Sequence, residues 1–480
     1  MRTLWYMGAK TRLTDSIAAA VASASPRGRA VCDLMSGTAS VSTALCGRYR
    51  VLANDVQAYA QAVAAAYLEH DRASRRVLET LDPEADLGAA YRRNRDALLS
   101  QLGPAAAVED AFLRASGLEV AARDRQEDPN QAGLFLAPEL PPARRRLPVD
   151  AQLRAGAYRT FALQSTPTFC EANDARPSGP FRDAAGLFER GAIMARRAAP
   201  STFPYHLCSS YYPNVYLGLR QAVDLDSLRY AIDQLSGRGA AAKRRHYLAA
   251  LLHAASVTTS ATSHFCQPRG LVRDAEVLAV LQRRSVSIPS RVLAFSHAIR
   301  TTCRQTDPHE GSRASCADWR TLYASGALDL IDVVYADPPY TADNYSRFYH
   351  VLEVLTRYDY PELQVSRGKT TKGRYPVIGE RHQSPFCHRR GVDAELRALC
   401  QETAARGASL VLSYAQENGL WFKVQTERGA SPAEAREGFL DLARAAYRDV
   451  RLETRGLLHS GQGDSNHQVT ELLLVARKPR

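Results

Sequence analysis

Four consecutive residues, Asp337-Pro338-Pro339-Tyr340, carry the strongest chemical signal in the sequence. They directly follow an apolar run at 328–336, which predicts a buried strand. Ligands of open α/β sheets bind beyond the carboxyl ends of the strands, so we expect these four residues to face a cleft. One carboxylate, one backbone carbonyl and one aromatic ring suit an exocyclic amine, because they supply two acceptors for its N–H bonds and a stacking plane.

Two acidic residues near the N-terminus lie at the ends of two further predicted strands. Asp33 lies in the apolar run 29–35, and a Gly/Ser/Thr loop through Gly37 follows it. A strand that turns through a glycine can bring backbone amides against a ligand. Asp55 closes the next run, 49–55, eighteen positions after Gly37. An acidic residue at about this separation is placed to accept hydrogen bonds from ribose hydroxyls.

Two other groups of residues are weaker candidates. Tyr6, Gly8 and Lys10 form an aromatic, turn and cation pattern that does not define a ligand by itself. The segment 366–391 holds seven cations against one carboxylate, a balance of 7 − 1 = +6. Because the segment follows the predicted helix after the Pro-Pro motif, we expect it to overhang the same cleft and grip phosphates. The contact candidates are Arg367, Lys369, Lys372 and Arg374.

The elements that must position these residues read as an α/β fold. The predicted strands 29–35 and 49–55 lie at one end of the chain, and 328–336, 409–414 and 468–477 lie at the other. Helices are predicted near 12–21, 224–235 and 243–257, and an exposed Pro-rich linker at 124–150. We therefore expect one sheet built from both ends of the chain with a helical and loop-rich insertion between them. The expected domains are 1–70 and 241–480 for the two parts of the sheet domain and 71–240 for the insertion.

Composition narrows the class of partner. The 480 residues carry a net charge of +12 and a sequence pI near 9.3, which favours a polyanion such as nucleic acid. The nine cysteines contain no C-x-x-C pair, so neither a zinc site nor a disulfide framework is expected. No apolar run approaches the roughly 20 residues that cross a bilayer. We expect a cytoplasmic protein that binds neither a membrane nor a metal.

Together the motifs resemble the DNA N6-adenine methyltransferases of the α group, the Dam-like enzymes, in both residue type and order. The resemblance implies a Rossmann-like class I methyltransferase sheet, S-adenosylmethionine as cofactor and double-stranded DNA as substrate. It implies an insertion that reads the target sequence, and a role in restriction-modification or phage defence, where a partner protein is possible. The cofactor-binding residues that it implies are Tyr6, Gly8, Lys10, Asp33, Gly37, Asp55 and Asp318. It assigns the flipped target adenine to Asp337, Pro338, Pro339 and Tyr340.

Two alternatives remain open. An N4-cytosine DNA methyltransferase presents the same kind of amine, although that family usually carries Ser at the position of Asp337. Methyltransferases of protein glutamine or of rRNA usually carry Asn there. The second alternative is a DNA-binding subunit of a defence system that has lost methyl transfer. The intact Lys10, Asp55 and Asp337 argue against it.

Overall fold

The computed structural model describes residues 10, 13–116, 156–162, 179–262, 264–460 and 466–479. The chain forms two compact units. Unit 1 contains residues 1–72, 302–346 and 382–480, and unit 2 contains 73–301 and 347–381. The predicted domains divide the chain differently: residues 241–301 and 347–381, which we expected in the sheet domain, belong to unit 2. Tyr6, Gly8 and the predicted linker 124–150 lie outside the described residues.

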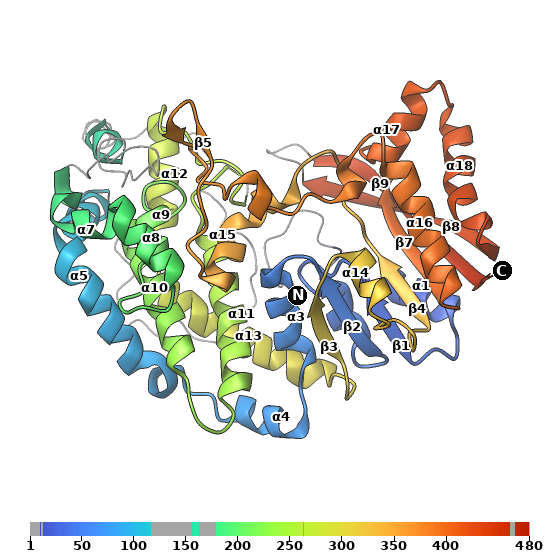
Figure 1. The fold of residues 1–480 in the computed structure, drawn as a ribbon, viewed down its shortest axis with the longest axis horizontal. Coiled ribbons are helices and arrows are strands. Elements are labelled where there is room, and N and C mark those ends of the chain that lie inside the picture. Colours follow the sequence, from blue (N-terminus) through green and yellow to red (C-terminus); the bar gives the residue numbers. More distant parts are fainter. Residues whose placement is uncertain are drawn as a thin grey trace. The chain divides into compact units, whose positions relative to one another are not determined.

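Unit 1 is built on a seven-stranded sheet in the order β3-β2-β1-β4-β7-β9-β8. The first five strands of this order are parallel, and β9 is antiparallel to both of its neighbours (Figure 1). The strands are β1 (Ala30–Asp33), β2 (Arg50–Asp55), β3 (Arg313–Cys316), β4 (Val333–Ala336), β7 (Ser409–Ala415), β8 (Tyr447–Ser460) and β9 (Asn466–Pro479). This confirms the predicted α/β, Rossmann-like sheet assembled from both ends of the chain.

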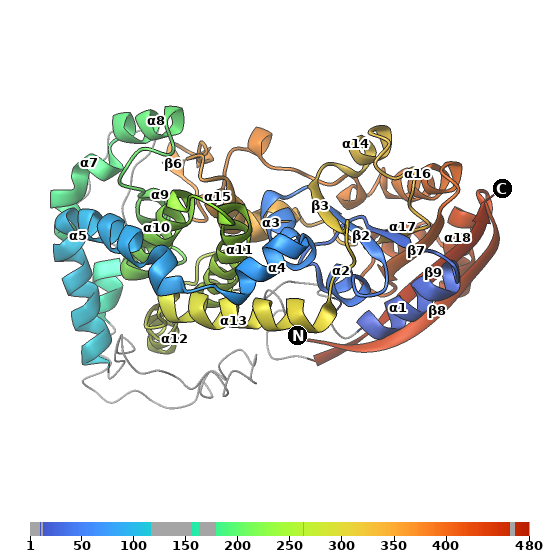
Figure 2. The same ribbon diagram turned by 90° about the horizontal axis from the view of Figure 1, so that it is seen from below.

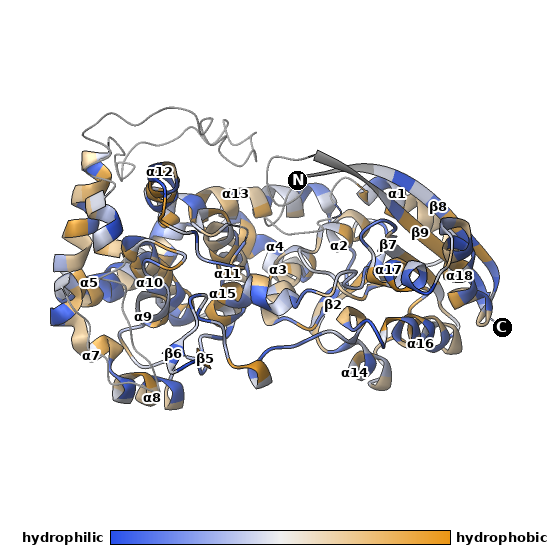
Figure 3. Cartoon of the chain, turned by 90° about the horizontal axis from the view of Figure 1, so that it is seen from above, coloured by the Kyte–Doolittle hydropathy of each residue, from blue (hydrophilic) through white to orange (hydrophobic). Residues whose placement is uncertain are grey.

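Helices cover both faces of this sheet (Figure 2). One face carries α1 (Thr14–Ala24), α2 (Ser40–Leu45) and α3 (Ala58–Leu68); the other carries α14 (Trp319–Ala324), η5 (Pro385–Cys387), α16 (Val392–Ala405), α17 (Leu420–Glu427) and α18 (Pro432–Arg444). Successive strand residues alternate between the two cores: Val31 packs with the first set of helices and Cys32 with the second. Figure 3 shows both hydrophilic and hydrophobic residues on α16 and α18, as expected of helices that pack on one side.

Unit 2 is mainly helical. Its longest helix, α5 (Pro83–Ala115), is capped by Asp82, whose carboxylate accepts from the amides of Glu84 and Ala85. Its other elements are η3 (Gly179–Ala184), α7 (Ala185–Phe188), α8 (Arg190–Ala198), α9 (Leu207–Tyr211), α10 (Leu219–Gln234), α11 (Ala240–Thr258), α12 (Asp274–Arg284), β5 (Val365–Ser366), β6 (Lys369–Thr370) and η4 (Ile378–Glu380). Three helices begin in one unit and end in the other: α4 (Arg72–Glu79), α13 (Ile288–Thr306) and α15 (Tyr345–Arg357). In the described residues no helix is both long and apolar enough to span a membrane.

The parallel strands place the predicted chemistry on one edge of the sheet. Asp33 is the last residue of β1 and Asp55 the last of β2. Asp337 directly follows β4, and Tyr335 of that strand pairs with Asp33 in register. Because all three strands run in the same direction, their carboxyl ends meet, and the three carboxylates collect there.

Candidate active site

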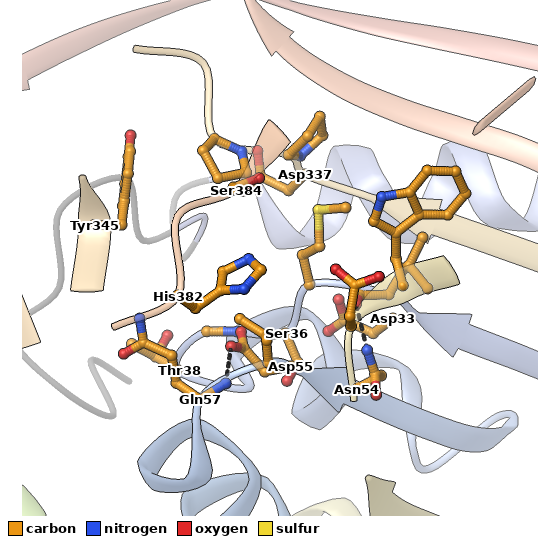
Figure 4. Close-up of a pocket in the computed structure, with 18 of the residues that line it drawn as sticks. Asp33, Ser36, Thr38, Asn54, Asp55, Gln57, Asp337, Tyr345, His382 and Ser384 are labelled. Atoms are coloured by element: carbon orange, nitrogen blue, oxygen red, sulfur yellow. Dashed lines mark hydrogen bonds between the residues drawn. The ribbon is translucent and has the colours of Figure 1, made fainter. Parts of the chain in front are cut away.

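A pocket in unit 1 opens at this carboxyl edge. Its lining comes from three separate stretches of the sequence: 10–57, 317–346 and 382–387. Figure 4 shows His382 lying between Ser36 and Ser384, with Asp55 and Asp337 on opposite sides of it. The pocket is lined by Lys10, Asp33, Leu34, Met35, Ser36, Gly37, Thr38, Ser40, Val41, Asn54, Asp55, Val56, Gln57, Ala317, Asp318, Trp319, Tyr335, Asp337, Pro338, Pro339, Tyr340, Tyr345, Ser346, His382, Ser384 and Cys387.

Asp55 fixes the glycine loop. One carboxylate oxygen accepts from the backbone N–H of Gly37 at 2.9 Å, and the other accepts from that of Gln57, also at 2.9 Å. Gly37 has φ +50°, a value that glycine adopts without steric cost. Ala39 has φ +58°. This left-handed backbone is a conformation that glycine adopts more easily than alanine.

Asp33 is almost fully buried, with 1% of its surface exposed. Its Oδ2 accepts from the backbone N–H of Ser42 at 3.0 Å and from the Ser42 hydroxyl at 2.6 Å. Burial raises the pKa of the Asp33 carboxyl to about 7, although the bonds from Ser42 oppose the rise and the nearby Asp337 adds to it. Asp33 is therefore a carboxyl group that titrates near neutral pH at the floor of the pocket.

Five buried polar atoms of residues that line the pocket have no hydrogen-bond partner within the described residues: Asp33 Oδ1, Ser36 Oγ, Gln57 Oε1, Trp319 Nε1 and the Tyr335 hydroxyl. A sixth, Asp337 Oδ1, has only its ion pair with Lys10. A buried polar group left without a partner costs about 1–3 kcal/mol. Five such atoms around one cavity indicate that it is shaped for a polar ligand with both donors and acceptors. The ammonium, sulfonium, ribose and adenine groups of S-adenosylmethionine fit that set, so the residues present agree with the implied cofactor.

Asp318 and its neighbours also line the pocket. Asp318 caps α14, and its Oδ1 accepts from the backbone N–H of Arg320 at 3.0 Å. The neighbouring Trp319 ring is 4% exposed and lies 4.5 Å beneath the Arg320 guanidinium. Burial lowers the pKa of His382, while Asp318 opposes that change. Sequence reasoning missed Trp319, Tyr345, His382 and Ser384, because no motif or spacing marks these residues.

Lys10 lines the same pocket beside the Pro-Pro motif. Its ammonium is 3.0 Å from Asp337 Oδ1 and 2.9 Å from Glu471 Oε1, and 5.5 Å from the centre of the Tyr340 ring. Burial alone would lower the pKa of Lys10, but the two carboxylates outweigh it and raise the pKa. Burial also raises the pKa of Asp337, and Lys10 opposes that rise. Lys10 is thus held charged at the Pro-Pro motif.

The predicted residues of the sheet domain thus share one pocket: Lys10, Asp33, Gly37, Asp55, Asp318, Asp337, Pro338, Pro339 and Tyr340. The four predicted phosphate contacts belong to unit 2. Arg367, Lys369 and Lys372 are exposed on and beside the β5–β6 hairpin. Arg374 is different, since it is only 5% exposed. We therefore remove Arg374 from the predicted phosphate contacts, because a buried guanidinium cannot reach a DNA backbone.

Within the described part of the chain no group of three or more His, Cys, Asp or Glu residues could hold a metal ion. Among the residues that the structure describes, none of the eight cysteines forms a disulfide.

Comparison with known proteins shows which protein family this sequence resembles. The family model of the D12 class N6 adenine-specific DNA methyltransferases matches residues 6–103 and 324–399. Modification methylase LlaI of Lactococcus lactis subsp. lactis is 27% identical over 182 residues, which cover 36% of this chain and 25% of the relative. Type II methyltransferase M.FokI of Planomicrobium okeanokoites is 33% identical over 96 residues, covering 20% of this chain and 13% of the relative.

The chain thus spans a quarter or less of the length of these two curated relatives. No solved structure gives a significant match. The family match contains Lys10, Asp33 and Asp55 in its first stretch and the Asp337 motif in its second. Over residues 6–103 and 324–399, which supply most of the pocket lining, the chain is similar to the D12 class N6 adenine-specific DNA methyltransferases.

Proposed function

We propose that the protein is an S-adenosylmethionine-dependent DNA methyltransferase that methylates N6 of an adenine rotated out of the duplex. The observation that carries the proposal is the pocket itself. It brings the Asp337 motif, the glycine loop and Asp55 to one sheet edge from segments about 280 residues apart, as counted from Asp55 to Asp337. The family match over both segments supports the same activity.

The target base would lie against the Asp337 motif. The amine lone pair of adenine is delocalised into its ring, so the amine is a poor nucleophile. Acceptance of its two N–H bonds by the Asp337 carboxylate and the Pro338 carbonyl favours a tetrahedral nitrogen whose lone pair is free to react. The fixed acceptors also stabilise the positive charge that develops on that nitrogen. Tyr340 would stack on the base, which must leave the helix to reach the pocket.

The cofactor supplies an electrophilic methyl group on a sulfonium. Asp33, with its unpartnered oxygen and the adjacent Gly37 loop, would hold the methionine end. Asp55 would accept from the ribose hydroxyls while it retains the Gly37 amide, because a carboxylate has about four lone-pair sites. Asp318 and the buried Trp319 would enclose the adenine ring of the cofactor. Holding both reactants in one pocket supplies much of the acceleration.

The experiment that tests the activity is methyl transfer to DNA. We expect tritium from labelled S-adenosylmethionine to enter duplex DNA and to be recovered as N6-methyladenine after digestion to nucleosides. Single-molecule sequencing of DNA from cells that express the chain would give the target sequence. Label in N4-methylcytosine would favour the cytosine alternative. A folded protein that binds DNA but not the cofactor in calorimetry would favour the catalytically silent defence subunit.

The DNA contact is the second part of the proposal. The hairpin cations Arg367, Lys369 and Lys372 would grip phosphates, which carry no base information. Changing all three to Gln should weaken binding to every sequence about equally. The slope of log K against log salt should flatten by about 0.9 for each phosphate that is no longer neutralised. The control is the triple change to Gln of Arg92, Arg273 and Arg357, which are exposed arginines already paired with carboxylates. An unchanged slope in the hairpin variant would contradict the proposed grip on the DNA backbone.

Modification methylases among the relatives suggest a setting in restriction-modification, and we propose the same for this chain. The partner would be a nuclease that cuts the unmethylated target sequence. Expression of the candidate nuclease should be lethal in cells without the methyltransferase and tolerated in cells that contain it. Survival that does not depend on the methyltransferase would contradict this setting.

A further inference from the structure

A buried carboxylate outside the pocket contacts its catalytic end. Glu471 lies on β9, and its side chain is 5% exposed. Its Oε1 is 2.9 Å from Lys10 Nζ and also accepts from the hydroxyl of Ser413, on the adjacent strand β7. Glu471 is absent from the pocket lining, so it acts on the site through its ion pair with Lys10 and through its charge.

The charges of the three ionisable groups at this position do not cancel. One ammonium, Lys10, lies between two carboxylates, Asp337 and Glu471, so the charges sum to +1 − 2 = −1. A buried Lys–Asp pair would be neutral without Glu471. Each further charge taken out of water costs several kcal/mol unless it is compensated. A second carboxylate at this position therefore needs a reason beyond the packing of β9.

We propose that Glu471 is a positioning residue for methyl transfer: by sharing Lys10 with Asp337, it keeps the Asp337 carboxylate a strong acceptor for the target amine. This inference rests on the proposed function. If Lys10 faced Asp337 alone, its full positive charge would attract the electron density of that carboxylate. Asp337 would then be a weaker hydrogen-bond acceptor. The Ser413 hydroxyl donates to Glu471 Oε1, the same oxygen that contacts Lys10, and so fixes that oxygen beside the ammonium.

The direction of the effect follows from the charges that face Asp337. Burial and the negative charge of Glu471 raise the pKa of Asp337, and Lys10 lowers it. The charged and titratable groups around Asp337 are Lys10, Asp33, Tyr335, Tyr340 and Glu471. Glu471→Gln removes one negative charge and keeps an oxygen that can accept from Lys10. The pKa of Asp337 should then fall by roughly one unit.

The test is the pH dependence of single-turnover methylation. In Glu471→Gln the acidic limb of the rate profile should move to lower pH by roughly one unit. The plateau rate should fall several-fold, because a less basic carboxylate is a weaker acceptor. Glu453→Gln is the matched control: Glu453 lies on the adjacent strand β8, where it pairs with Arg455 and is 31% exposed. We expect the control to retain the wild-type profile.

A fall in rate with an unmoved limb would mean that Glu471 only stabilises the fold, and it would overturn the proposal. Carbon-13 NMR of labelled aspartate carboxyls separates this inference from the proposed function, since it needs no activity. Asp337→Asn assigns the signal, and the Asp337 titration should move to lower pH in Glu471→Gln. An unmoved titration overturns the role of Glu471 even if the protein methylates DNA. A moved titration in a protein that methylates nothing contradicts the proposed function alone.

Discussion

The two ends of the pocket hold their carboxylates in different ways. At the glycine-loop end, Asp33 and Asp55 accept hydrogen bonds from backbone amides and a hydroxyl. At the Pro-Pro end, Asp337 and Glu471 share a single ammonium, that of Lys10. The first arrangement ties the position of a charge to the fold of the loop. The second ties the position of the charge to the side chain of Lys10, whose own charge is shared between two carboxylates.

This difference separates binding from chemistry. Carboxylates held by backbone amides present a preformed surface, which suits a cofactor that must be bound repeatedly in the same pose. Carboxylates held by an ammonium can be tuned by a neighbouring charge, which suits the end where charge develops during reaction. Substitutions at the two ends should therefore fail in different measurements.

The largest expected effect is at Asp337. Asp337→Ala removes an acceptor for the target amine, and the loss of one fixed hydrogen-bonding group at a reacting centre costs about 10²–10³-fold in rate. Cofactor affinity should change less than in Asp55→Ala, because Asp55, Asp33 and the Gly37 loop are the residues proposed to hold the ribose and the methionine end. Tritiated methyl incorporation measures the rate, and calorimetry measures cofactor binding. A fully active variant would contradict the assignment of methyl transfer to the Asp337 end of the pocket.

Tyr340 provides the companion test at the same end. Tyr340→Ala should lose most methylation, since base–aromatic stacking is worth about 1–3 kcal/mol per base. Tyr340→Phe should retain much of it, because the plane matters and the hydroxyl does not. Fluorescence of 2-aminopurine at the target position reports base extrusion. Extrusion should fall in the Ala variant and persist in both Tyr340→Phe and Asp337→Ala.

At the glycine-loop end, Asp55→Ala should weaken S-adenosylmethionine binding by roughly ten- to a hundredfold, since hydrogen bonds to charged groups contribute about 1.5–3 kcal/mol. Part of that loss would come from the freed Gly37 amide. Asp55→Asn keeps an oxygen for that amide but removes the charge, so its affinity should lie between those of Asp55→Ala and the wild type. Calorimetry on the folded variants makes the comparison. An unchanged dissociation constant for the Ala variant would contradict the ribose assignment.

Asp33 should give the unliganded protein a pH-dependent stability. Its carboxyl has a pKa of about 7 in the fold, above the ordinary value of 3.8. Between these values the folded state holds a proton that the unfolded state has lost, so stability falls as pH rises through this window. Asp33→Asn should abolish this component of the slope. Urea unfolding at pH 5, 6, 7 and 8 measures it, and identical slopes in both proteins would contradict the raised pKa.

The smallest effect is expected at Ala39. Ala39→Gly relieves a left-handed conformation worth about 1–2 kcal/mol, but it removes a buried methyl worth about 0.8 kcal/mol. It also adds freedom to the unfolded chain, at about 0.4–1 kcal/mol. The free energy of unfolding should therefore stay within about 1 kcal/mol of the wild type in urea titrations, with unchanged cofactor affinity. A tenfold change in that affinity would show that residue 39, rather than Asp55, fixes the loop.

Sequence reasoning found the strands that are continuous apolar runs, such as β4 and β7, because strands buried on both faces contain little else. It missed β3 and β8, whose residues alternate or are only partly buried. It found the pocket residues that belong to a contiguous motif. Glu471 could not be found in this way, because its only signal is a carboxylate within an apolar strand. Its relation to Lys10 exists only after the sheet has formed.

Strands β1 and β4 are neighbours in the sheet but far apart in the sequence, so the sheet is completed late in synthesis of the chain. The amide of Arg29, beside β1, bonds to the carboxylate of Asp332, which is 303 residues later. At 5–20 residues per second a ribosome needs roughly 15–60 s to make that stretch. During that time β1 and β2 can pair with each other, but each has one edge without its final neighbour. A nascent chain must therefore keep these apolar strands from other chains until β3 and β4 emerge. Residues 73–301 of unit 2 fill most of that interval, but unit 2 also contains residues 347–381, which are made after β4.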